Sequence, residues 1–273
     1  MNLRVASGQF PVGPELRENV EHVREQIAEA GAGGARIVVF PESALSGYTP
    51  WEFPDLTGFD WAALERATED VREAAAAASL WVLVGSISPS SDPQRPFNSV
   101  LVVSPDGEVH GRYDKRLLAA SERDHFTPGD SPLTFRVDGF TCGIAICHEW
   151  RYPEVYREYG RLGADVVFQS WYDGAYDGEG WEREGRNLSE VIPATARGHA
   201  VCNHLWIVGS NTARPRSAFA PFVVRPDGGL HACGTRERTE VLLADLGPRD
   251  GVPDGSIHHR TRLLEGESLL PEA

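Results

Sequence analysis

The sequence predicts a layered α/β fold of the α+β type, with strands of mixed direction and helices on the outside. Two observations predict it. Short apolar runs alternate with helical patterns in the first third of the chain, and glycine-containing turns then join neighbouring runs into antiparallel hairpins. With 273 residues, 41% of them hydrophobic, the chain can bury one sizeable core. We therefore expect a single domain over residues 1–273, with a core at 1–250 and a C-terminal tail at 251–273.

The first third of the chain alternates between strands and helices. A helix is predicted where apolar residues recur at steps of three or four from Leu16 to Ile27, because this spacing forms one apolar stripe. The glycine-rich stretch that follows ends this helix. The expected elements are a strand at 3–10, a helix at 15–30, a strand at 36–40, an alanine-rich helix at 61–79 and a strand at 80–85.

Hairpins are predicted in the middle of the chain. Ser104-Pro-Asp-Gly107 is typical of a turn, and Asp138-Gly139 of a shorter one. Strands joined by such short turns must pair antiparallel. The expected strands are 99–103 with 108–113, and 133–137 with 140–147.

The last third returns to the alternation of strands and helices. Pro153 lies where a helix can begin, and residues 171–186 form an aromatic, acidic and glycine-rich stretch that we predict to be a loop. The other expected elements are a strand at 165–169, a helix that Pro193 starts or kinks and that runs to about 202, a strand at 205–210, a hairpin of 220–225 with 240–244, and a polar tail.

Composition narrows the possible partners. The chain has 40 acidic and 26 basic side chains, a net charge of −14, and no block rich in lysine or arginine. Such a charge repels phosphate backbones and anionic lipids, so we expect no nucleic acid and no membrane as a partner. The N-terminus reads directly as a strand without an apolar leader, and four irregularly spaced cysteines do not make a disulfide scaffold. We therefore expect a cytoplasmic protein with reduced thiols.

Cys147 carries the most chemical information. It ends an apolar run that begins at Phe140, and a polar run beginning with His148 follows at once. A strand that delivers a thiol to its polar carboxyl end fixes the sulfur, while the loop stays open to substrate. Because a free thiol is mostly protonated at neutral pH, a catalytic cysteine needs a base or a cation nearby.

Two other segments can supply those groups. An apolar run at 37–40 leads to Glu42, and a short extended stretch presents Lys115. A carboxylate buried beside a thiol has a raised pKa and is a stronger base than an exposed one. Lys115 would balance that carboxylate and hold the developing oxyanion, with the backbone N–H of His148 as a second donor. Each residue alone is more simply read as a buried thiol or a solvated charge.

Together, the three segments resemble the nitrilase superfamily of carbon–nitrogen hydrolases. The matching motifs are Phe40-Pro41-Glu42 with Gly47-Tyr48, Tyr113-x-Lys115, and Gly143-Ile-Ala-Ile-Cys147 with Arg151-Tyr152-Pro153-Glu154. Further agreement comes from Glu122 with Phe126-x-Pro128-Gly129, from Ala194-x-Ala196-Arg197 and from Asn211. The resemblance covers nearly the whole chain.

This resemblance implies an α-β-β-α sandwich that forms a homodimer. It implies that Glu42 is the general base, Lys115 the oxyanion-stabilising cation and Cys147 the nucleophile. Glu122 would be a second glutamate that orients substrate and assists proton transfer. The implied reaction is thiol attack on a small-molecule amide, loss of ammonia or amine, and hydrolysis of the thioester by water. It needs neither a metal nor an organic cofactor.

The residues after Cys147 leave the substrate branch open. Many amidase branches carry Cys-x-Asp where this chain has Cys147-His148-Glu149, and the nitrile-hydrolysing branch typically carries Cys-Trp-Glu. The Arg-Tyr-Pro-Glu continuation is amidase-like. We therefore expect hydrolysis of a small linear amide or N-carbamoyl compound, with nitrile hydrolysis as the alternative, and we expect His148 and Glu149 to contact substrate.

The predicted loop at 171–186 is expected at the mouth of the pocket. Its aromatic residues, beginning with Trp171 and Tyr172, alternate with acidic ones, of which Asp173 is the first, and we expect these three residues to contact substrate. One hypothesis is a lid that selects a cationic or aromatic amide. A solvated loop or a dimer contact is the simpler interpretation.

Two other classes of protein compete with the enzyme. A catalytically silent binding or scaffold protein would keep the fold without the chemistry. A zinc-binding module would use His199, Cys202 and His204, but no second paired motif completes a tetrahedron, and a buried helix end explains these residues more simply.

Overall fold

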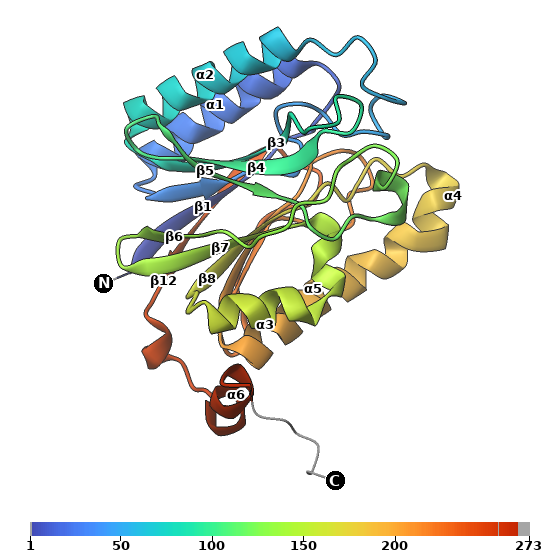
Figure 1. Cartoon of the computed structure of the whole chain (residues 1–273). Coiled ribbons are helices and arrows are strands. Elements are labelled where there is room, and N and C mark those ends of the chain that lie inside the picture. Colours follow the sequence, from blue (N-terminus) through green and yellow to red (C-terminus); the bar gives the residue numbers. More distant parts are fainter. Residues whose placement is uncertain (1, 256, 267–273) are drawn as a thin grey trace.

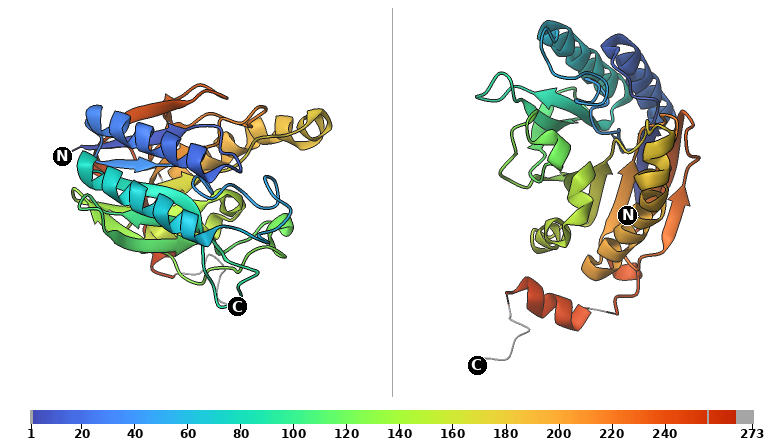
Figure 2. Two further views of the ribbon diagram at one scale, coloured as in Figure 1. Left: turned by 90° about the horizontal axis from the view of Figure 1, so that it is seen from above. Right: turned by 90° about the vertical axis from the view of Figure 1, so that its right-hand side faces the viewer.

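The computed structural model describes residues 2–255 and 257–266, and these are arranged in four layers (Figure 1). Two sheets of six strands each pack face to face. Helices α1 (Leu16–Ala32) and α2 (Trp61–Ala78) lie side by side on one outer face, as Figure 2 also shows, and α3 (Pro153–Arg161) and α5 (Arg186–Asn203) cover the other. The predicted α-β-β-α sandwich is confirmed.

The first sheet contains both parallel and antiparallel pairs. Its strand order is β12-β1-β2-β3-β4-β5, and β1, β2 and β3 run parallel to one another. The remaining neighbours pair antiparallel. The strands are β1 (Leu3–Gln9), β2 (Ile37–Val39), β3 (Trp81–Ser88), β4 (Phe97–Val103), β5 (Val109–Asp114) and β12 (Glu240–Leu246).

The second sheet repeats this design. Its order is β11-β10-β9-β8-β7-β6, with β7, β8 and β9 parallel and antiparallel pairs at both edges. The strands are β6 (Thr134–Val137), β7 (Phe140–Ile146), β8 (Val166–Ser170), β9 (Trp206–Ser210), β10 (Phe222–Val224) and β11 (Leu230–Cys233).

The helices form where the sequence supplies stripes and caps. The apolar stripe of α1 buries Val23 and Ile27 completely against the first sheet. The carboxylate of Asp60 accepts the Ala63 N–H at 2.8 Å and caps the start of α2. The shorter helical segments are α4 (Gly178–Gly180), α6 (Ile257–Leu264), the 3-10 turns η1 (Ala120–Glu122), η2 (Cys147–Arg151) and η4 (Arg249–Gly251), and the π-helical turn η3 (Trp181–Gly185). No helix in the described part of the chain is both long enough and apolar enough to cross a membrane.

Three apolar layers hold the sandwich together. One lies between α1 and α2 and the first sheet, one between the two sheets, and one between the second sheet and its helices. The middle layer brings together side chains from both sheets, such as Val39 and Leu83 from the first and Ile144 and Phe168 from the second. Burial on both faces explains why these strands read as continuous apolar runs.

The strand directions bring several carboxyl ends to one edge of the sandwich. In the first sheet, β2 and β5 end at the same edge, because two antiparallel pairings separate β5 from the parallel β3. In the second sheet, β7 and β8 are parallel and end together. The main chain joins the two edges, because the N–H of Glu42 donates to the carbonyl of Trp171 at 3.2 Å. Open α/β sheets place ligands at such edges.

The structure corrects the predicted pairing of the last hairpin. The strand predicted at 240–244 does not pair with 220–225; it is β12 and pairs antiparallel with β1 in the other sheet. The partner of β10 is β11 (Leu230–Cys233). The local turn pattern identified a hairpin correctly, but the second strand lies nearer in sequence than predicted.

The predicted loop at 171–186 is only partly a loop. A helical run begins at Gly178 and continues through η3 into α5. The Asp177 carboxylate accepts the Gly180 N–H at 2.6 Å and caps this start, so Pro193 lies inside a helix that began earlier. The predicted tail contains α6, and its residues 267–273 lie outside the described residues.

Gly85 of β3 packs against the main chain of the segment that carries Glu42. A Cβ atom at this position would come within 2.3 Å of the Pro41 carbonyl oxygen and 2.5 Å of the Ser43 nitrogen. We expect Gly85→Ala to lower the free energy of unfolding by about 1–3 kcal/mol, because rigid main chain must move to make room. Urea denaturation measures this loss. Gly251→Ala, where a Cβ meets open space, is the control, and an equal loss in both variants would contradict the packing argument.

Candidate active site

Glu42 lies at the carboxyl end of β2, where the two sheets meet. Its side chain is completely buried. Its main-chain N–H is held by the Trp171 carbonyl, and Ser43 adopts a left-handed conformation with φ of 54° that turns the chain sharply after the glutamate. One carboxylate oxygen, Oε2, accepts the N–H of Tyr172 at 3.1 Å. Contacts from the second sheet therefore fix the glutamate of the first.

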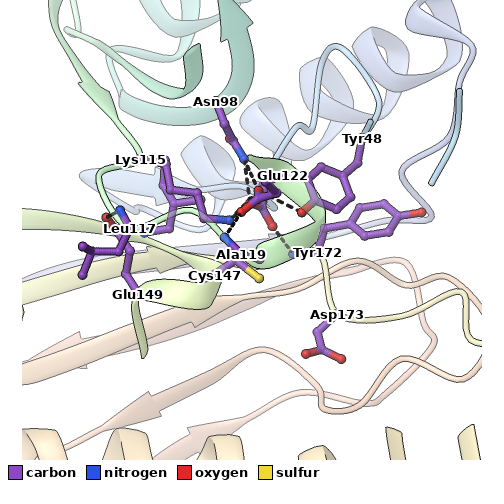
Figure 3. Close-up of polar contacts among 12 residues, drawn as sticks. Tyr48, Asn98, Lys115, Leu117, Ala119, Glu122, Cys147, Glu149, Tyr172 and Asp173 are labelled. Carbon is purple, nitrogen blue, oxygen red and sulfur yellow. Dashed lines mark hydrogen bonds and ion pairs between the residues drawn. The ribbon is translucent and has the colours of Figure 1, made fainter. Parts of the chain in front are cut away.

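Lys115 lies between two carboxylates. Its Nζ is 2.7 Å from Oε1 of Glu42 and 2.7 Å from Oε1 of Glu122, and all three side chains are completely buried. Figure 3 shows the lysine side chain directed at Glu122. The lysine follows β5, and its N–H donates to the Asn98 carbonyl at 2.8 Å. The structure thus brings together three residues that the sequence places 73 and 7 positions apart.

Two further residues, Asn98 and Tyr48, complete this cluster, and no catalytic or structural role was predicted for either of them from the sequence. Asn98 donates its amide to Glu42 at 2.8 Å and to Glu122 at 3.1 Å. The Tyr48 hydroxyl donates to Glu122 at 2.9 Å. Tyr48 belongs to a motif on which the family resemblance rests, so the sequence already indicated that it lies near the site. An asparagine at the start of an ordinary strand carries no comparable signal.

The surroundings of Glu42 and Glu122 shift the pKa values of the two carboxyl groups in opposite directions. Burial and the neighbouring Glu122 charge raise the pKa of Glu42, although Lys115 opposes them. Burial also opposes ionisation of Glu122, but Lys115, the Ala119 N–H at 2.6 Å and the Tyr48 hydroxyl outweigh it and lower the pKa of Glu122. Burial works against the charge on Lys115 too, yet the two carboxylates raise its pKa. Glu42 is therefore the better proton acceptor of the pair.

Cys147 lies where β7 passes into η2, close to the charged cluster (Figure 3). It has a left-handed backbone with φ of 37°, which is strained for any residue except glycine. Its carbonyl accepts the side-chain amide of Gln169 at 3.2 Å, which holds this turn against β8. Cys147 as a whole residue is partly exposed, while its thiol lies among buried groups. Burial, and next the charge of Glu42, raise the pKa of Cys147, so the thiol is protonated at neutral pH and needs a base.

Glu149 was expected to contact substrate, but in the structure its side chain is buried and bound to other groups of the protein. It is completely buried, and both carboxylate oxygens are engaged by the protein. Oε2 accepts the Ile146 N–H at 2.7 Å, and Oε1 accepts the Arg116 N–H at 2.9 Å. The Tyr113 hydroxyl binds both oxygens. Glu149 therefore links the turn that carries Cys147 to the segment that carries Lys115.

Trp171 and Tyr172 lie at the site in different ways. The Trp171 side chain is fully buried in the outer core against Phe219 and Phe222, so only its backbone reaches Glu42. This corrects the expectation that its ring contacts substrate. The Tyr172 ring lies 5.0 Å from the Tyr48 ring, and its hydroxyl donates to Glu52. These two tyrosines form an aromatic pair beside the cluster.

His148 and Asp173 also surround Cys147. His148 is half-buried, with its Nε2 3.4 Å from the Tyr152 hydroxyl. Burial, and then the charge of Lys115, lower the pKa of His148, so the imidazole is neutral at pH 7. Asp173 is buried and accepts the Tyr176 hydroxyl at 2.9 Å. Burial raises the pKa of Asp173 to about 7.

The residues considered as zinc ligands have other partners. The His199 ring stacks on Tyr156, and its Nε2 lies 2.8 Å from the Trp150 carbonyl. Cys202 is exposed, and His204 Nε2 lies 3.2 Å from the Arg249 carbonyl. Within residues 2–255 and 257–266, no cluster of three or more histidine, cysteine or acidic side chains has the arrangement to hold a metal ion.

Replacing Lys115 by methionine should make stability depend strongly on pH. Without the cation, Glu42 and Glu122 face each other while buried, so the pair titrates with a raised pKa. Stability held by carboxyl groups with a raised pKa is present at low pH and is lost as the pH rises through that pKa. We expect Lys115→Met to lower the free energy of unfolding by about 3–5 kcal/mol at about pH 8 and by less at about pH 5.

Urea denaturation at the two pH values measures this difference. Arg112→Met, which removes the more exposed partner of Asp114, is the control and should show a small loss at both. An equal loss at both pH values for Lys115→Met would contradict the assigned charges.

Replacing Glu149 by glutamine should loosen two segments at once. The amide nitrogen cannot accept the N–H groups that the carboxylate holds, so at least one buried donor loses its partner. We expect Glu149→Gln to lower the free energy of unfolding by about 1–3 kcal/mol, measured by urea denaturation. Glu158→Gln makes the same change in a more exposed ion pair with Arg116 and should have little effect. An unchanged free energy of unfolding for Glu149→Gln would contradict the proposal that this carboxylate holds the two segments together.

Comparisons with known proteins agree with this geometry. The family model described as carbon–nitrogen hydrolase matches residues 4–250. The chain is 27% identical to a hydrolase of Mycobacterium tuberculosis (strain ATCC 25618 / H37Rv) over 89% of both chains. It is 26% identical to the omega-amidase NIT2 of Homo sapiens, over 90% of this chain and 88% of the relative.

The solved structures agree on the fold. An amidase of the nitrilase superfamily from Nesterenkonia AN1 superposes with a TM-score of 0.76 at 19% identity, covering 95% of this chain and 97% of that one. Another structure of the amidase from Nesterenkonia sp. AN1, in which its active-site cysteine carries the acetamide moiety of fluoroacetamide, superposes at 0.79 with 20% identity and 96% coverage of both. The chain therefore belongs to the carbon–nitrogen hydrolase family, and its relatives include amidases.

Proposed function

We propose that this enzyme hydrolyses the C–N bond of a small linear amide or N-carbamoyl compound through a thioester on Cys147. One observation carries the proposal: the protonated thiol of Cys147 lies beside a buried carboxylate with a raised pKa, and both lie beside a buried cation. A thiol nucleophile, a base and a charge stabiliser are the groups that acyl transfer needs.

In the first half of the reaction, Glu42 takes the proton of the Cys147 thiol while the sulfur attacks the carbonyl carbon. The oxygen that becomes negative lies against Lys115 and the His148 N–H. The first N–H groups of a helical turn such as η2 have no carbonyl partner inside that turn. The tetrahedral intermediate collapses when the C–N bond breaks, and the proton held by Glu42 leaves with the nitrogen as ammonia or an amine.

In the second half, water replaces the leaving group. Glu42 takes a proton from water, the hydroxide attacks the thioester carbon, and the C–S bond breaks. The proton returns to the sulfur, which restores the thiol and releases a carboxylic acid. Glu122, ionised by its contacts with Lys115 and Ala119, keeps the lysine charged and directed through both steps and assists in orienting the substrate.

The relatives support amide chemistry. The human protein in the comparison is an omega-amidase, and the cysteine of the Nesterenkonia amidase forms covalent adducts with small amide compounds. The nitrilase alternative had rested on Glu149. Its carboxylate is occupied by main-chain donors, so it is not free to bind a substrate, and product analysis decides between amides and nitriles.

The setting of the enzyme is part of the proposal. A cytoplasmic location is supported by the four cysteines, all of which are free thiols. A homodimer is also part of the proposal. Analytical ultracentrifugation would measure the oligomeric state.

Removing the sulfur should abolish turnover. We expect wild-type protein to release ammonia from short amides or N-carbamoyl amines, and Cys147→Ala to lower kcat/KM by about a thousandfold or more. Iodoacetamide should label Cys147, as seen by peptide mass spectrometry. Cys202→Ala, which removes an exposed thiol on α5, is the matched control and should keep wild-type activity.

Product analysis separates the alternatives. Carboxylic acid formed from a nitrile at a rate comparable to the amides would favour the nitrilase. Turnover that survives in Cys147→Ala would contradict the role of this thiol as nucleophile. No turnover of any amide, carbamoyl compound or nitrile by the wild-type protein would contradict the proposed chemistry and favour a silent scaffold.

A further inference from the structure

Asp173 is a buried carboxylate at the active site with no cation paired to it. It follows β8 and is 8% exposed. Among the described residues, its side chain makes one hydrogen bond, from the Tyr176 hydroxyl to Oδ1 at 2.9 Å, and no ion pair. Buried carboxylates are normally paired or fully hydrogen-bonded. The second oxygen, Oδ2, is therefore available to another group.

The backbone of Asp173 is held rigidly. Its N–H donates to Oδ1 of Asn211 at 2.8 Å, and its carbonyl accepts both the Asn211 side-chain amide at 3.0 Å and the Ala218 N–H at 2.9 Å. Asn211 follows β9 directly, so a strand end of the second sheet positions this loop. A side chain mounted in this way is ordered before any ligand arrives, which is what a binding group requires.

Asp173 shares one electrostatic environment with the catalytic residues. Burial, then the charges of Glu42 and Asp173, raise the pKa of Cys147, and burial, then the charges of Glu184 and Glu42, raise the pKa of Asp173. Figure 3 shows its carboxylate on the same side of the cluster as the Cys147 sulfur, below the Tyr172 segment. Lys115 is already shared by two glutamates, so the site holds more carboxylates than its one buried lysine can balance.

We propose that Asp173 binds a protonated amino group at the far end of the substrate, so that the enzyme selects linear amides or N-carbamoyl compounds that carry a primary amine. This inference rests on the proposed amide hydrolysis. The ammonium group would donate to Oδ2 while the Tyr176 hydroxyl keeps Oδ1. A substrate ending in a carboxylate would instead meet like charges in a site of low dielectric and bind poorly.

Three primary amides of similar length test this selectivity. 5-Aminopentanamide is cationic, hexanamide is its neutral isostere, and glutaramate is anionic. For the wild-type enzyme we expect kcat/KM for the cationic amide to exceed that for the neutral one by about tenfold or more, and glutaramate to be the poorest, because a site built for a polar group rejects analogues that leave it unpaired. Equal or better turnover of hexanamide would overturn the inference.

Two variants locate the effect. Asp173→Asn should lower the ratio of kcat/KM between 5-aminopentanamide and hexanamide by about tenfold, mainly through KM, because only the charge is removed. Asp177→Asn removes the same charge from an exposed residue four positions later, and asparagine can still cap Gly180, so the ratio should stay at the wild-type value. Equal changes in the two variants would assign the effect to the general charge of the loop and overturn the role of Asp173.

Binding without turnover distinguishes this inference from the proposed function. Calorimetry on Cys147→Ala compares the affinity for 5-aminopentanamide with that for hexanamide. If the wild-type enzyme hydrolyses none of the amides but this variant prefers the amine, the amine site stands and the proposed reaction fails. If the amides are hydrolysed and Cys147→Ala binds both equally, the reaction stands and the amine site fails.

Discussion

The structure of this active site depends on one buried ammonium group shared by two buried carboxylates. Lys115 contacts Glu42 and Glu122 at 2.7 Å each, with no exposure of any of the three. Removing three charges from water is costly, and the cost is offset only when the groups remain in close contact. The two sheets must therefore bring these segments together and keep water away from them. Asn98 and Tyr48 supply the remaining hydrogen bonds of the cluster.

Main-chain contacts transmit this constraint to the rest of the sandwich. The carbonyl of Trp171 holds the backbone of Glu42, the carboxylate of Glu149 holds the segments of Cys147 and Lys115, and Asn211 holds Asp173. Each is a buried polar group that contacts backbone rather than substrate. These contacts keep Cys147, whose backbone has a strained left-handed conformation, in a fixed place at the edge of the two sheets.

The same environment gives chemically similar carboxylates different properties. Burial and a like charge raise the pKa of Glu42, whereas lysine and backbone contacts lower the pKa of Glu122. Glu149 is buried as well, and burial raises its pKa, but its oxygens are occupied by donors from the chain itself. Asp173 lacks such donors on one oxygen. Position in the fold, rather than residue type, thus distinguishes the proposed base Glu42, its charge partner Glu122, the structural carboxylate Glu149 and the candidate binding group Asp173.

The sequence by itself determined the layered sandwich and the candidate catalytic residues. Apolar periodicity and turn residues are local signals, so they located most helices and strands, and motif order identified Glu42, Lys115, Cys147 and Glu122. Only the tertiary structure decided that β12 joins the first sheet, because strand pairing is long-range. It also decided that Glu149 faces inward and that Asp173 is left without a cation, because burial and hydrogen-bond partners depend on which distant segments the packed sheets bring together.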